Sequence, residues 1–253
     1  LRLDDTHFRC AHNRRLGLAI TPLESTCEGC GREIDAYGNH LSCCMRTARV
    51  QLRHTPLVAA WLLILREAGI SVPRRNIERV MHTTHINRGP DDNRRMDIIT
   101  SGIPGVFRGK PLFMDATCVS PLHGNGTAMR NAARRDGGVL EAADKRNREV
   151  DYPDVERSND AELLCLGVET FGRWNHHCLQ LVSQLAAFKA ADSPWKLQKS
   201  VQHALLTRWW GILSISLQRI VAASLLRPGG SDLIEAGGAC GPGVMDLLDL
   251  HRD

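Results

Sequence analysis

The sequence predicts an α/β protein whose core elements follow the order αβββαβ. A helix is expected at residues 51–68, because apolar residues dominate this stretch and Gly69 follows it as a helix terminator. Four runs of strand type come after it, at residues 77–81, 96–100, 111–119 and 162–170. A long polar helix is expected at residues 127–148, between the last two strands. Helices and strands in this order build a sheet covered by helices.

Local signals support each element. Residues 57–65 are apolar nearly all round, so the first helix is expected to be buried on several sides. The sequence SGIPGVFRGK at residues 101–110 predicts a hairpin connection between two strands. Gly137 and Gly138 predict a break in the long polar helix.

Two further helices are expected to close the fold, at residues 175–190 and 195–226. Apolar residues recur at helical spacing in the second, which is typical of a core helix. Its most apolar part, residues 209–226, contains Gln218 and Arg219 and is a poor membrane span. No membrane partner is predicted.

The chain begins with Leu1 rather than Met and is predicted to be the tail of a longer polypeptide, in five segments. These are a linker from a preceding region at 1–22, a small Cys/His-rich module at 23–50, the main domain at 51–190, a C-terminal helix at 191–226 and a flexible Gly/Pro-rich tail at 227–253.

Composition narrows the function classes. The net charge of +4 permits nucleic-acid binding without arguing strongly for it. Aromatic residues make up only 5% of the chain, which weighs against an extended base-stacking platform for single strands. Nine cysteines without secretory context predict thiols and metal ligands rather than disulfides.

The module at residues 23–50 contains a predicted zinc site. Cys27 and Cys30 have C-x2-C spacing, and His40 and Cys44 follow with H-x3-C spacing. Such ligands suit tetrahedral structural Zn²⁺, whose binding would largely fold the module. Cys43 is an open alternative to Cys44, and the four side chains could also be unconnected. The remaining thiols considered, expected to be inert, are Cys10, Cys118, Cys165 and Cys178.

Two aspartates and a lysine form a predicted catalytic set. Asp97 and Asp115 adjoin neighbouring strands, so their carboxylates should reach one edge of the sheet, where Mg²⁺ could bridge them. Lys145, on the following helix, would be their cationic partner in phosphodiester hydrolysis. The alternative is that both aspartates are turn residues or ion-pair partners. Basic residues on either side could hold phosphates or could equally form solvated faces.

These pieces, in this order, resemble the C-terminal end of reverse transcriptases of site-specific non-LTR retrotransposons and their relatives. In that family a zinc knuckle precedes a restriction-like endonuclease of the PD-(D/E)xK superfamily. The matching segments are RRLGL, CEGC, DAYGNHLSCC, the pair Arg53-His54, RRMD, FMDATCVSP, EAADKRN and VETFGRW, which run from Arg14 to about Trp174.

The resemblance implies a restriction-endonuclease-like αβββαβ core and a CCHC-type zinc knuckle. It implies a Mg²⁺-dependent endonuclease that nicks target DNA for target-primed reverse transcription, with the reverse transcriptase covalently linked upstream, in the nucleus. DNA is the expected partner, and element RNA a further one. Lys145 would be the lysine displaced onto the helix, and Glu169 matches an acidic position of the fourth strand. The nucleic-acid contacts expected are Arg53, His54, Arg94, Arg95 and Arg146.

The sequence departs from the family pattern at some positions. Met96 replaces the proline common before the first aspartate, and Glu67 or Glu78 would have to substitute for a missing Glu-Pro pair. The expected tyrosine after the lysine is at best Tyr152. Two alternatives therefore stay open, a non-catalytic zinc-containing nucleic-acid-binding module and a structural remnant without activity.

Overall fold

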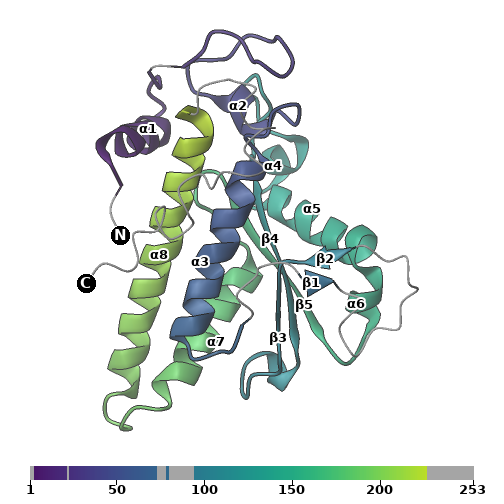
Figure 1. The fold of residues 1–253 in the computed structure, drawn as a ribbon, viewed down its shortest axis with the longest axis vertical. Coiled ribbons are helices and arrows are strands. Elements are labelled where there is room, and N and C mark those ends of the chain that lie inside the picture. The colour runs from purple at the N-terminus through teal and green to yellow at the C-terminus, as the bar shows by residue number, and fades with distance from the viewer. Residues whose placement is uncertain (1–2, 22, 73–77, 80–93, 227–253) are drawn as a thin grey trace, which may run out of the picture.

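The protein has a mixed α/β fold built on a three-stranded sheet (Figure 1). The computed structural model describes residues 3–21, 23–72, 78–79 and 94–226. The sheet has the order β3 (Ile98–Thr100), β4 (Leu112–Val119) and β5 (Glu162–Glu169). Strand β4 pairs antiparallel with β3 and parallel with β5. The prediction of a mixed α/β protein is thus confirmed.

A second, two-stranded sheet pairs β1 (Glu78–Arg79) with β2 (Arg95–Met96). The strand predicted at residues 96–100 is therefore interrupted, since a bend at Asp97 separates β2 from β3. The strand predicted at residues 77–81 is seen only at its second and third positions, because residues 77, 80 and 81 lie outside the described residues. The described elements follow the predicted order along the chain.

The hairpin predicted at residues 101–110 is confirmed. It joins the antiparallel strands β3 and β4 and contains a short 3₁₀ turn, η3 (Phe107–Gly109). A Cβ atom at Gly102 would lie 2.0 Å from the carbonyl oxygen of Gly109, so the loop can close only with glycine there.

Helices come before, between and after the strands along the chain. Their bounds are α1 (Asp5–Leu16), α2 (Asn39–Cys43), η1 (Gln51–Arg53), α3 (His54–Glu67), α4 (Arg130–Arg134), α5 (Gly138–Arg146), the π-helical turn η4 (Asn147–Asp151), α6 (Pro153–Arg157), α7 (His176–Ala190) and α8 (Gln198–Leu226).

The predicted break at the two glycines divides the long polar helix into α4 and α5. Gly137 has a φ of +77°, which favours glycine, and α5 begins at the next residue. A Cβ atom at Gly138 would lie 2.2 Å from the carbonyl oxygen of Asn131, so α4 folds back closely onto the start of α5. The predicted break at the two glycines is therefore confirmed.

The two faces of the sheet meet different partners (Figure 1). One face, with Met114 and Leu166, packs with α3, α7 and α8 into the main core. Trp61 of α3 has no exposed surface, as the apolar centre of that helix predicted. The other face, with Phe113 and Leu163, packs against residues of and around α6 in a smaller cluster. Asp115 alternates in phase with Phe113 along β4 and so points toward this second face.

The N-terminal segments pack onto the main domain instead of extending from it. Helix α1 lies along α8, and α2 lies near the end of α8 (Figure 1). Buried Arg14 donates to the hydroxyls of Ser42, at 2.7 Å, and of Thr170, at 3.2 Å. Buried Arg49 donates to the last carbonyls of α8, those of Ser224 and Leu225, both at 3.2 Å. Arg14 and Arg49 thus connect three regions of the chain: helix α1, the Cys/His-rich module and the main domain with α8.

Helix α8 is long and apolar enough, by length and composition alone, to cross a membrane. In the described part of the chain, 56% of its most apolar window is buried inside the molecule. Its neighbours are α1, α3 and α7. This is the packing expected of the core helix that the sequence predicts.

We expect Glu67→Ala to destabilise the fold by about 1–3 kcal/mol. Glu67 accepts a hydrogen bond from the indole Nε1 of Trp209 at 2.9 Å, and Trp209 has no exposed surface. Removing the carboxylate leaves that N–H buried without an acceptor. Chemical denaturation measures the change. Glu67→Gln retains an acceptor and should lose less.

The control is Arg208→Ala. Arg208 makes a bidentate pair with Glu67 at 2.6 and 2.9 Å, but its side chain is 58% exposed, so its loss should cost less than about 1 kcal/mol. Equal losses for Glu67→Ala and Arg208→Ala would show that the ion pair, not the indole contact, carries the stabilisation.

Candidate functional site

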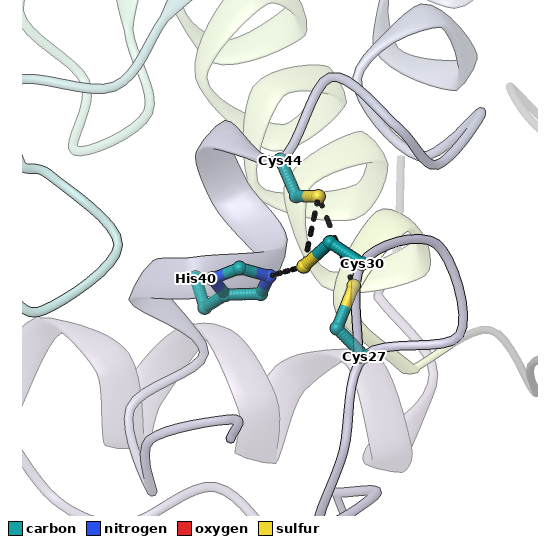
Figure 2. Close-up of side chains that lie close together, drawn as sticks. All are labelled: Cys27, Cys30, His40 and Cys44. Carbon is teal, nitrogen blue, oxygen red and sulfur yellow. Dashed lines mark hydrogen bonds between the residues drawn. The ribbon is translucent and has the colours of Figure 1, made fainter. Parts of the chain in front are cut away.

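Cys27, Cys30, His40 and Cys44 form a compact group, here called the Cys/His quartet (Figure 2). One ligand atom from each side chain lies within 4.8 Å of the others. The Sγ atom of Cys44 lies 3.7 Å from that of Cys27 and 3.9 Å from that of Cys30, and His40 Nε2 lies 3.1 Å from Cys30 Sγ. Tetrahedral zinc with bonds of about 2.3 Å to sulfur requires sulfur atoms about 3.8 Å apart. The quartet could therefore hold a zinc ion.

Local backbone contacts create this arrangement. The amide of Cys27 donates to the carbonyl of Arg32, and the amide of Gly31 donates back to the carbonyl of Cys27, which closes a tight turn around the first pair. Asp35 accepts hydrogen bonds from the amides of Tyr37, Asn39 and His40 and so caps α2, which carries the histidine. The backbone amide of Arg32 is the main cause of a lowered pKa at the Cys30 thiol.

The choice between Cys43 and Cys44 is decided by direction. Cys43 Sγ lies 3.4 Å from the carbonyl oxygen of Asn39 and 3.5 Å from that of His40, inside its own helix. Cys44 Sγ faces the other thiols. Cys44 is therefore the fourth member of the quartet. The thiols predicted to be inert (Cys10, Cys118, Cys165 and Cys178) lie outside it.

The two aspartates lie across the antiparallel pair β3–β4. Ile98 pairs with Met114, and continuing this register places Asp97 opposite Asp115. At the bend the Asp97 carboxylate accepts a hydrogen bond from the amide of Ala116 at 2.7 Å. A side-chain oxygen thus meets the β4 amide next to the end of the β3–β4 ladder. Asp97 is thus bonded to β4 next to Asp115, but Asp115 lies in the middle of β4, the central strand, so the predicted position at one edge of the sheet is wrong.

His54, the first residue of α3, contacts Asp97. Its Nε2 lies 2.9 Å from Asp97 Oδ2 and must carry the proton, because an ionised carboxylate only accepts hydrogen bonds. The hydrogen bond to Asp97 is the largest cause of a raised pKa at His54, and burial opposes it. The His54 side chain is 40% exposed. His54, which was predicted as a nucleic-acid contact, therefore contacts one of the two aspartates.

Asp115 is held by an amide. Asn147 Nδ2 donates to Asp115 Oδ2 at 2.9 Å from the first position of η4. Burial raises the pKa of Asp115 to about 7, with the charge of Asp97 as the second cause and His54 opposing. We refer to Asp97, Asp115, His54 and Asn147 together as the carboxylate site.

Lys145 is not brought to these carboxylates. Its side chain is 71% exposed, and its ammonium lies 3.8 Å from Glu149. Two residues along a helix differ by about 200° in direction, so Lys145 and Asn147 point to opposite sides. Asn147 was not among the site residues predicted from the sequence. Its signal was the helical phase of Leu140, which is buried and lies seven positions, or two turns, earlier.

The predicted nucleic-acid contacts fall into two groups. Arg53 is only 1% exposed and donates to the carbonyl of Ser42 at 2.7 Å, so the prediction for this residue is corrected: it joins α3 to the Cys/His module. Arg94 is mostly buried and pairs with Asp154 at 3.0 Å. Arg95 is exposed, and Arg146 is 75% exposed with Asp151 at 3.5 Å.

The acidic candidates other than the two aspartates lie elsewhere. Glu169 is buried at the end of β5 beside Arg173, at 3.9 Å, and burial raises its pKa. Glu67 is bound to Arg208 and Trp209. The side chain of Glu78 lies outside the described residues. None of these three is shown next to the aspartates.

The donor atoms of the carboxylate site suit a hard cation. Asp97 Oδ1 and Asp115 Oδ1 accept no hydrogen bond within the described residues, and neither oxygen is fully enclosed. Carboxylate oxygens are what Mg²⁺ prefers. Among the described residues, however, the Cys/His quartet is the only group of three or more acidic, histidine or cysteine side chains close enough together to hold one ion. Water would therefore have to supply most of the remaining ligands of a cation here.

Metal analysis distinguishes a thiol of the quartet from the thiol of Cys43. We expect Cys30→Ser to lose about one equivalent of bound zinc, because it removes a thiolate from the quartet. Cys43→Ser is the matched control and should keep its zinc, since that thiol contacts only backbone carbonyls. Elemental analysis of the purified proteins measures both. Zinc-free wild-type protein would contradict the zinc assignment.

Asp115→Asn should stabilise the protein, and more so at pH 8 than at pH 5. A folded-state pKa of about 7, against the ordinary value of 3.8, means that ionising Asp115 opposes folding, so its stability contribution falls as the pH rises between these values and levels off above about 7. The gain at pH 8 should reach up to about 4 kcal/mol, since each pKa unit corresponds to about 1.4 kcal/mol. Denaturant unfolding without added divalent ions measures it. A gain independent of pH would contradict the raised pKa.

Comparison with known proteins assigns the chain to no family. No protein-family model matches the chain, and no curated protein matches it. The interpretation of the site therefore rests on its own residues.

Proposed function

We propose that the chain is the Mg²⁺-dependent endonuclease region of a retrotransposon reverse-transcriptase polyprotein, which nicks target DNA to prime reverse transcription. The observation that carries the proposal is the pair Asp97 and Asp115. They lie opposite each other across β3 and β4, and each keeps one carboxylate oxygen without a partner in the described chain. Two such oxygens beside the end of the β3–β4 ladder are suited to a divalent cation that binds phosphate.

The surrounding architecture supports the same proposal. A buried helix, short antiparallel strands, a second helix and a parallel strand follow one another in the order expected for a restriction-endonuclease-like core. The Cys/His quartet precedes them, as a zinc knuckle does in the retroelement proteins that the sequence resembles. Here the quartet has a structural role, because all four ligands come from protein.

Asp97 and Asp115 would hold the Mg²⁺ ion, which when bound supplies charge neutralisation at the scissile phosphate and acidifies a water molecule. The protein's own residues prepare the site. His54 and the amide of Ala116 hold Asp97, and Asn147 holds Asp115. Exposed Arg95 and Arg146 are available to phosphates beside the site, where their contacts would weaken with rising salt.

A second function has one observation in its favour. Lys145 faces solvent and Glu149 rather than the aspartates, which is compatible with a nucleic-acid-binding module that no longer cuts. In that case plasmid DNA binds without being nicked, and the binding weakens steeply as salt rises. The role predicted for Lys145 stays a prediction that its alanine variant tests.

Supercoiled plasmid with Mg²⁺ tests the nuclease. We expect conversion to nicked circles, reduced by at least about 100-fold in both Asp97→Ala and Asp115→Ala, because each substitution removes a carboxylate from the site. Gel electrophoresis over time measures the rate. Glu149→Ala, an exposed carboxylate on the adjacent turn, is the control and should cut at the wild-type rate. Unchanged nicking in both aspartate variants would refute the site.

A further inference from the structure

Each aspartate of the carboxylate site is held at one oxygen by a side chain from the start of a helical segment. His54 Nε2, at the first position of α3, lies 2.9 Å from Asp97 Oδ2. Asn147 Nδ2, at the first position of η4, lies 2.9 Å from Asp115 Oδ2. The two donors leave the other oxygen of each carboxylate, Oδ1, without a partner in the described chain.

The burial of Asn147 is not explained by packing alone. The residue is 4% exposed, and its Oδ1 atom is buried without any hydrogen-bond partner. An unsatisfied buried amide oxygen costs free energy and is uncommon in folded proteins. A leucine of similar size would avoid that penalty. Within the described residues, the one hydrogen bond that the Asn147 side chain makes is to Asp115.

The backbone at Asn147 is also unusual. Helix α5 passes into a π-helical turn at this residue. Such turns are rare and are found frequently at functional sites. The Asn147 side chain is thus buried at an energetic cost, lies on a rare backbone turn and contacts one carboxylate. These three features point to a role in holding that carboxylate.

We propose that His54 and Asn147 are positioning residues that fix Asp97 and Asp115 with both Oδ1 atoms available to one Mg²⁺ ion. This inference rests on the cation of the proposed function. Two neighbouring carboxylates repel each other, and a donor on each Oδ2 offsets part of that repulsion before a cation arrives. Partners of this kind, one step removed from a metal, typically change metal affinity 10–100-fold when removed.

Calorimetric titration of the full, zinc-loaded chain with MgCl₂, without DNA, tests the proposal. We expect Asn147→Leu and His54→Ala to bind Mg²⁺ 10–100-fold more weakly than the wild type. His54→Gln should recover most of the affinity, because its amide nitrogen can donate from a similar position. Glu149→Ala, an exposed residue of the same π-helical turn, should bind within twofold of the wild type.

Thermal unfolding of the same samples separates positioning from a merely structural role. Asn147→Leu removes a buried unsatisfied oxygen but also the donor to Asp115 Oδ2, and these two effects oppose each other, so its melting temperature should stay close to that of the wild type while its Mg²⁺ affinity falls. If Asn147→Leu does not fold, Asn147→Ala is titrated in its place, with the same expected loss. Either folded variant binding Mg²⁺ as tightly as the wild type would overturn the role of Asn147, and His54→Ala doing so would overturn that of His54.

The outcome for the wild type distinguishes this inference from the proposed function. Wild-type protein that binds no Mg²⁺ overturns both the positioning roles and the metal-dependent nuclease. Wild-type protein that binds Mg²⁺, with weakened variants but no plasmid nicking, supports the positioning roles and overturns only the nuclease.

Discussion

The carboxylate site depends on the hydrogen bond from the amide of Ala116 to the side chain of Asp97. A strand amide that loses its partner in the sheet interior costs free energy, so something must accept it. Where the backbone bends between β2 and β3, the Asp97 carboxylate does so. The side chain is thereby tied to β4 one residue beyond Asp115, and the two carboxylates cannot separate without breaking the bond.

Holding the carboxylates together has an electrostatic consequence. Burial and the neighbouring charge of Asp97 keep the pKa of Asp115 near 7, so that around neutral pH a proton would compete with the proposed cation for the same group. A divalent ion bound between the two carboxylates would offset their repulsion. The stability of the free protein and its affinity for the proposed cation would then be opposed.

Short-range signals in the sequence predicted much of this fold. The hairpin at residues 101–110, the break at Gly137 and the spacing of the Cys/His quartet are each encoded within about twenty residues. The split of β2 from β3 was not predicted, because it depends on a hydrogen bond from another strand to Asp97. The direction of the Lys145 side chain was not predicted for a different reason. Which side of α5 and η4 faces the core is shown only by the burial of Leu140 and Asn147.

The burial of Arg53 could not be predicted either, because its acceptor, the carbonyl of Ser42, belongs to a segment that the sequence predicted as a separate module.

That contact gives the start of α3 a double role. Arg53 is bound to the carbonyl of Ser42 in α2, the helix that carries His40 of the quartet, and the next residue, His54, is bound to Asp97. Two consecutive residues therefore connect the Cys/His quartet to the carboxylate site through one helix start. Because α3 is buried along most of its length, this start cannot shift independently of the core. The Cys/His quartet and the carboxylates are consequently parts of one packed unit.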